Sequence, residues 1–275
     1  MRPYKPDDGD GVSRSNGSRP IGVFDSGVGG LTVFREIARA LPGESLIYLG
    51  DSARVPYGTK SPGIVTRYAL EAARHLLGRN IKMLVVACNT ATAAALPTLR
   101  ETLTIPVIGV VEPGARAAVE RTKGRIGVIA TEGTVNSRAY TRAIHALDSN
   151  VDVIESPAPL FVALAEEGWA NTHVAREVAE IYLEPLIDAG IDTLVLGCTH
   201  YPILRGTIES VVGDKVAIVD SAETTAACVQ QDLKSRNTSG KASYEFLVTD
   251  AEERFRRIAA EFLEREIDNL ELVSL

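Results

Sequence analysis

The chain has 275 residues, 45% of them hydrophobic and 24% charged, with a formal net charge of −7; this is an ordinary composition for a folded globular protein. The acidic balance and the lack of a long basic run argue against nucleic-acid binding, and no apolar stretch reaches the ~18 residues of a membrane span. The three cysteines are too few for a disulfide framework and lack the spacing of a metal site. With no apolar signal near Met1, the sequence predicts a cytoplasmic protein without a bound metal.

Residues 1–19 are rich in Gly, Ser, Pro and Asp and carry almost no apolar side chains. Such a segment cannot bury enough apolar surface to offset the entropy of ordering, so we expect a disordered tail. From Pro20 the pattern changes to apolar runs of strand type that alternate with helical periodicity. In this first half the sequence predicts strands at 21–26, 45–51, 82–87 and 106–111 and helices at 31–41, 62–79 and 89–103.

The pattern then restarts, because GRIGVIAT at 124–131 echoes RPIGVFDS at 19–26. In the second half we predict strands at 124–131, 151–156 and 193–197 and helices at 135–147, 173–190 and 203–212. The rest of the chain adds strands at 216–220, 243–250 and 270–275 and helices at 224–236 and 251–266.

Strands that alternate with helices predict parallel sheets covered on both faces. The restart predicts an α/β fold made of two pseudo-symmetric α/β domains with the active site in the cleft between them. We expect a first domain of residues 20–110 plus about 221–275, where the last segment is placed by analogy, and a second domain of residues 111–220.

Two of the three cysteines, Cys88 and Cys198, directly follow apolar strands at matching places in the two halves. Ligands of open α/β sheets bind at the carboxyl ends of the strands. The N-terminus of the helix that follows each strand carries partial positive charge and favours an anion. We therefore expect it to bind a substrate carboxylate and to lower the pKa of the thiol. Cys228 lies in an amphipathic helical pattern and is interpreted as a small buried hydrophobe.

The turn DSGVGGLTV at 25–33 suggests an alternative, a dinucleotide-binding loop with Asp51 as a ribose ligand. The fingerprint needs a third small residue at the position where the sequence has Thr32. In addition, the carboxylate of Asp25 would face the pyrophosphate. Both features disfavour nucleotide binding.

Two thiols that face one ligand suit the inversion of a carbon centre, because one proton must leave one face while another arrives on the opposite face. Asp25 and His200, near the two thiols, are the natural groups to tune them, and Glu166 is a third candidate. The alternative interpretation of His200 is a hydrogen-bonded structural histidine, and that of Glu166 is a residue on a solvated helix face. A thiol redox protein, which would need its cysteine Cα atoms within ~7 Å, or a non-catalytic binding module also stays open.

Five motifs, GVFDSGVGGLTV, PYGTKS, VVACNTATA, FVALAEEG and LGCTHYPIL, closely resemble those of bacterial glutamate racemases of the cofactor-independent aspartate/glutamate racemase superfamily. The resemblance runs from about Ile21 to the C-terminus, with every motif in order. It implies interconversion of L- and D-glutamate without pyridoxal phosphate or another cofactor, supply of D-glutamate for peptidoglycan, and a homodimer. Aspartate racemase, whose substrate is one methylene shorter, is the near alternative.

The resemblance also implies roles for individual residues. Cys88 and Cys198 would be the two acid–base groups, acting on D-glutamate and L-glutamate respectively. Asp25 and Glu166 would assist near Cys88, and His200 would assist near Cys198. The substrate contacts would come from Asp25, Ser26, Tyr57, Gly58, Asn89, Thr90, Thr199 and His200.

Overall fold

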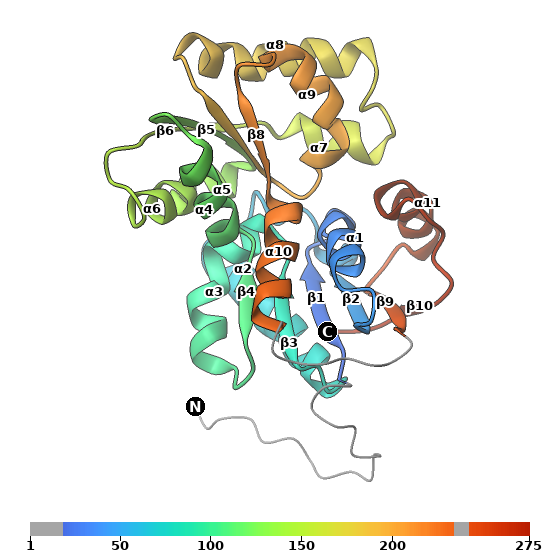
Figure 1. Cartoon of the computed structure of the whole chain (residues 1–275). Coiled ribbons are helices and arrows are strands. Elements are labelled where there is room, and N and C mark those ends of the chain that lie inside the picture. Colours follow the sequence, from blue (N-terminus) through green and yellow to red (C-terminus); the bar gives the residue numbers. More distant parts are fainter. Residues whose placement is uncertain (1–18, 234–241) are drawn as a thin grey trace.

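Two separate sheets of parallel strands form the centre of the molecule (Figure 1). The computed structural model describes residues 19–233 and 242–275. The expected disordered tail at 1–19 lies outside the described residues, apart from Arg19. Among the helices in the described part of the chain, none is long and apolar enough to cross a membrane.

The two sheets repeat one arrangement of strands. The first sheet has the order β10-β9-β2-β1-β3-β4 and the second has the order β6-β5-β7-β8. All neighbouring pairs are parallel, which confirms the predicted α/β class. The strands are β1 (Ile21–Asp25), β2 (Leu46–Gly50), β3 (Met83–Val86), β4 (Val107–Gly109), β5 (Arg125–Ala130), β6 (Asp152–Pro157), β7 (Thr193–Gly197), β8 (Ala217–Asp220), β9 (Tyr244–Val248) and β10 (Leu270–Leu272).

Equivalent glycines in β1 and β5 give the internal repeat a packing basis. A Cβ atom added to Gly22 would lie 2.8 Å from Ile81 Cδ1, and one added to Gly127 would lie 2.8 Å from Ile191 Cδ1. Each isoleucine stands shortly before the strand that leads to a thiol. Both halves therefore place the same small–large pair at the same point of the core, as expected for a diverged duplication.

Helices pack around the two sheets (Figure 1). Helix α10 packs beside α1, and β9 and β10 then extend the first sheet, so the chain after β8 returns to the first half. We keep the division near residues 110 and 220 as a proposal. The helices are α1 (Leu31–Ala40), α2 (Pro62–Gly78), α3 (Asn89–Thr102), α4 (Val111–Arg121), α5 (Glu132–Ser137), α6 (Ala139–His145), α7 (Leu160–Glu166), α8 (His173–Asp188), α9 (Arg205–Val212), α10 (Ser221–Leu233) and α11 (Glu252–Leu263).

The second half departs locally from the predicted elements. A single helix over 135–147 is wrong, because Arg138 adopts a left-handed conformation (φ 54°) that separates α5 from α6. A short 3-10 helix, Tyr201–Leu204, follows the second thiol in place of an immediate α-helix. Helices α4 and α7 have no counterpart among the predicted elements, and α7 carries a residue of the site, as described below.

The two halves share buried apolar surface. One continuous hydrophobic cluster contains Val23 of β1 and Leu194 of β7, both with no exposed surface. Burial of apolar surface stabilises such contacts by about 25 cal/mol per Å². The two halves thus share one packed core, which holds them together on either side of the cavity described next.

Candidate active site

Cys88 lies at the junction of β3 and α3. Its backbone is extended (φ −70°, ψ 121°), and its Sγ accepts a hydrogen bond from the Ala91 N–H at 3.4 Å, so the thiol caps the helix N-terminus. Its side chain is buried, with 5% of the residue exposed. The S–H group can also donate to Ser26 Oγ, 3.5 Å away, which follows β1 on the same sheet edge.

Burial dominates the acid–base behaviour of Cys88. Loss of solvation and then the nearby Asp25 carboxylate raise the pKa of the Cys88 thiol to about 12. The N–H of Ala91 at the helix N-terminus lowers this pKa, as expected, but desolvation of the thiolate outweighs that one hydrogen bond, so the expectation of a net lowered pKa is wrong. Burial also raises the pKa of Asp25, against the opposing charge of His200. Asp25 Oδ2 accepts from the Gly27 N–H at 2.8 Å.

Cys198 has a different set of neighbours. Its Sγ lies 3.7 Å from His200 Nδ1, and His200 Nε2 lies 3.0 Å from Glu166 Oε1. Arg254, on α11 of the C-terminal segment, donates to Glu166 Oε2 at 2.9 Å. These contacts form a chain from thiol to imidazole to carboxylate to guanidinium. Glu166 thus stands on the Cys198 side, which corrects the expectation that it assists Cys88.

The charges in this chain stabilise one another. Burial alone would lower the pKa of His200, but its hydrogen bonds to Cys198 and Glu166 raise that pKa to about 10. Burial alone would raise the pKa of Glu166, but His200 and Arg254 lower it to about 2. At neutral pH the imidazole is therefore protonated and the carboxylate ionised. The neighbouring Glu167 contacts this group through Arg254, whose Nη2 donates to Glu167 Oε1 at 3.2 Å.

Both thiols open into one cavity of about 430 Å³ between the two halves. Of the predicted site residues, all except Asp25 line it; Asp25 is buried, with 1% exposed. The predicted residues on the cavity wall are Ser26, Tyr57, Gly58, Cys88, Asn89, Thr90, Glu166, Cys198, Thr199 and His200.

Contacts between the halves shape the cavity wall. Asn89 Nδ2 donates to Tyr140 Oη at 2.8 Å, and the Oγ1 atoms of Thr90 and Thr131 lie 2.8 Å apart.

Thr131 and Arg254 line the cavity but were not predicted. Thr131 could have been found from the repeat, because it follows β5 as Ser26 follows β1. Arg254 comes from a distant helix, and no local pattern marks it.

The glycine-rich turn after β1 serves contact between the halves. A Cβ atom on Gly29 would lie 2.4 Å from Thr199 Oγ1 and 2.5 Å from His200 Cε1. Thr32, which breaks the dinucleotide fingerprint, donates through Oγ1 to the Thr199 carbonyl at 2.9 Å. The small residues let the first half approach the turn that carries Cys198.

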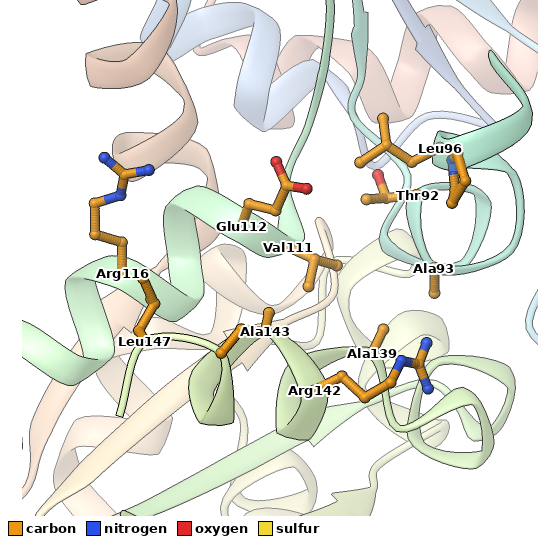
Figure 2. Close-up of a pocket in the computed structure, with 12 residues that line it drawn as sticks. Thr92, Ala93, Leu96, Val111, Glu112, Arg116, Ala139, Arg142, Ala143 and Leu147 are labelled. Carbon is orange, nitrogen blue, oxygen red and sulfur yellow. The ribbon is translucent and has the colours of Figure 1, made fainter. Parts of the chain in front are cut away.

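A second cavity of similar size, about 430 Å³, lies between α3, α4 and α6 (Figure 2). Its labelled side chains include Thr92 from α3, Glu112 and Arg116 from α4, and Arg142 from α6. Neither thiol and none of the predicted site residues lines it. The cavity between the thiols is therefore the candidate active site.

The fold and the site define a repeated α/β protein with one thiol from each half facing a shared cavity. The model of the Asp/Glu/Hydantoin racemase family matches residues 21–229, and the chain belongs to this family. It is 53% identical to the glutamate racemase of Geobacter metallireducens, over 94% of this chain and 97% of that protein.

Solved structures give the same result. The chain is similar to the crystal structure of a glutamate racemase from Bacillus anthracis, with TM-score 0.90, 42% identity, and 94% and 98% of the two chains covered. It is also similar to the glutamate racemase of Francisella tularensis in complex with D-glutamate, with TM-score 0.88, 39% identity, and coverage of 94% and 98%. The resemblance to glutamate racemases drawn from the motifs is confirmed.

Proposed function

We propose that this protein interconverts L- and D-glutamate without a cofactor, with one of Cys88 and Cys198 removing the α-proton and the other delivering a proton to the opposite face of the α-carbon. The observation that carries the proposal is that one cavity receives a thiol from each of two equivalent strands, β3 and β7. The relatives that match nearly the whole chain are named glutamate racemases, which supports glutamate as the substrate.

The proposed reaction balances within the two thiols and the substrate. One cysteine starts as a thiolate and takes the α-proton, so an S–H bond forms, the Cα–H bond breaks, and the electron pair passes to the α-carbon and its carboxylate. The other thiol then gives its proton to the opposite face of the α-carbon and becomes the thiolate. The two thiols have exchanged roles, and the reverse reaction starts from that state. In our proposal Cys88 takes the proton of D-glutamate and Cys198 that of L-glutamate.

The surroundings of each thiol suit this exchange. The His200 imidazolium, held by Glu166, lies with its Nδ1 3.7 Å from Cys198 Sγ, and we propose that it assists proton transfer by this thiol. Cys88 has no such cation beside it in the described residues, and burial disfavours its thiolate. We propose that the ammonium group of the bound substrate supplies the missing positive charge, and that the nearby Asp25 is the acid–base partner of Cys88.

The polar groups of the wall fit an amino acid with two carboxylates. Ser26, Thr90 and Thr199 present hydroxyl groups, and Asn89 presents an amide. We propose that these groups, with the backbone of Tyr57 and Gly58, hold the two carboxylates and the ammonium of glutamate, and that Asp25 and His200 also contribute to binding.

A direct assay tests the reaction and the substrate together. Purified protein, dialysed against a chelator, is incubated separately with L-glutamate and L-aspartate without added cofactor, and circular dichroism is followed. The proposal requires the signal of glutamate to decay to zero while that of aspartate persists. Decay for aspartate alone would replace glutamate by the near alternative, and no decay for either would refute racemisation.

We also propose that the enzyme works as a homodimer in the cytoplasm and that its D-glutamate enters peptidoglycan. Light scattering of the purified protein should give twice the mass of one chain, and a mass of one chain would contradict the dimer. Depletion of the protein in its host should be rescued by external D-glutamate if the product serves the cell wall, and failure of rescue would contradict that role.

A further inference from the structure

A fully buried carboxylate stands next to the candidate active site without lining it. Asp51 follows β2 and has no exposed surface. It accepts three side-chain hydrogen bonds, from Tyr57 Oη at 2.5 Å, Arg54 Nε at 2.7 Å and Thr249 Oγ1 at 3.0 Å. The sequence suggested this residue as a ribose ligand, but both of its oxygens are occupied by side chains of the same chain.

The three partners match the chemistry of a carboxylate. An ionised Asp only accepts hydrogen bonds, and in these contacts the phenol, guanidinium and hydroxyl groups all donate. Burial of a charge without such donors would be costly. The hydrogen-bonding capacity of Asp51 is therefore filled by its own chain, and the residue serves as an anchor. It lies at the carboxyl ends of the neighbouring strands β2 and β9.

The anchor holds a segment that forms one wall of the active-site cavity. Residues 55–59 all line the cavity, and Tyr57 within them is 2% exposed. The Tyr57 ring packs against Phe24 and Tyr68, with centroids 6.4 Å and 5.7 Å away. Because its hydroxyl is bonded to Asp51, Tyr57 offers the cavity its ring and its backbone.

The same segment is tied to the second half of the molecule at its other end. The Gly133 N–H donates to the Gly58 carbonyl at 2.9 Å. A Cβ atom on Gly58 would lie 2.9 Å from Thr131 Cβ, so the two halves are in close contact here. Segment 55–59 is thus fixed at two points, by Asp51 in the first half and by Gly133 in the second.

We propose that Asp51 is a positioning residue for substrate binding, acting through Tyr57 to hold segment 55–59 against the substrate. The effect on substrate rests on the proposed function, because that function assigns glutamate to this cavity. The contact acts on the wall of the cavity and involves neither thiol. Its loss should therefore weaken binding of the substrate in its ground state more than it slows proton transfer.

The test compares Tyr57→Phe, which removes only the hydroxyl, with Tyr68→Phe, which removes the same atom from the neighbouring ring. Tyr57→Phe should raise KM for glutamate about 10-fold, as expected for one hydrogen bond to a charged group, with kcat within about threefold. Tyr68→Phe should leave both constants unchanged. Asp51→Asn, which keeps an acceptor, should raise KM less, and the double variant should match Tyr57→Phe alone.

Two readouts separate this proposal from the proposed function. If the wild type does not racemise glutamate, the proposed function fails. Amide hydrogen exchange then tests the anchor by itself, because Tyr57→Phe should speed exchange within 55–59 and Tyr68→Phe should not. An active wild type with unchanged KM in Tyr57→Phe, or unchanged exchange in 55–59, would overturn the positioning role.

Discussion

Cys88 and Cys198 follow equivalent strands of a repeated fold, yet their neighbours come from unrelated parts of the chain. Cys88 caps α3 and has a buried carboxyl group, Asp25, near it. Cys198 has a protonated imidazole beside it, held by Glu166 and Arg254 from α7 and α11. The repeated fold thus accounts for where the thiols stand, whereas contacts particular to each half account for their different neighbours. The following experiments test this difference, beginning with the largest expected effect.

Removal of either thiol should abolish the overall reaction. Cys88→Ala and Cys198→Ala should each lower the racemisation rate by about 10³-fold or more, because general acid–base groups contribute about 10²–10⁴-fold and these two act as a unit. Circular dichroism of glutamate measures the rate. Cys228→Ala, which alters the half-buried thiol outside the cavity, is the control and should behave as wild type. A near wild-type rate in either active-site variant would contradict the paired mechanism.

Removal of the acid–base partner of each thiol, His200 for Cys198 and Asp25 for Cys88, should affect the two enantiomers of glutamate differently. His200→Asn should lower the overall rate about 10²-fold, with the larger loss in exchange of the α-proton of L-glutamate, which Cys198 is proposed to take. Asp25→Asn should instead slow exchange of D-glutamate more strongly. Proton NMR in deuterated water follows each enantiomer separately. An equal loss for both enantiomers in both variants would mean that the tuning groups do not belong to separate thiols.

Adjacent acidic residues provide a sharper comparison on the Cys198 side. Glu166→Gln should lower kcat about 10-fold, because it removes the carboxylate that holds the His200 imidazolium. Glu167→Gln should change kcat less than about twofold, since this residue contacts only Arg254 in the group and exposed ion pairs contribute little. Steady-state kinetics with glutamate give both values. Larger loss in Glu167→Gln would place the partner of His200 one residue further along.

The ion pair of His200 should also give stability a defined dependence on pH. The pKa of His200 is raised from 6.5 to about 10, so its contribution is fully present below 6.5 and is lost as pH rises through about 10. The Tm advantage of wild type over His200→Gln should therefore shrink between about pH 6 and about pH 10. Glu167→Gln, as the control, should keep the pH dependence of wild type. An advantage that grows with pH would show that the imidazole is neutral in the folded protein.

The sequence predicted most of the architecture because its signals were local. Apolar runs and helical spacing placed the strands and most of the long helices, although α4 was missed, and the echo of RPIGVFDS in GRIGVIAT revealed the repeat. The thiols and the polar residues next to them were found because they directly follow strands. Tyr57 and Gly58 were expected only from the resemblance to glutamate racemases, and more than half of the residues that line the cavity were not predicted. The left-handed Arg138 was missed because nothing in its neighbours demands a break in the helix.

The partner of each thiol could not be derived in the same way. Glu166 and Arg254 lie far from Cys198 in the chain and meet it only through the packing of α7 and α11. Assignment of Glu166 to the Cys88 side failed for this reason. The pKa of Cys88 was misjudged because a helix N-terminus is visible in a sequence, whereas the depth of burial that opposes it is not.

The most direct test of two opposed thiols uses each enantiomer of a glutamate analogue with a leaving group on the β-carbon. Elimination from such an analogue needs only one proton abstraction, so a variant with one thiol can still carry it out. We predict that Cys198→Ala eliminates from the D-analogue and Cys88→Ala from the L-analogue, both at reduced rates, while neither racemises glutamate. If both variants preferred the same enantiomer, the two thiols would not act on opposite faces of the substrate.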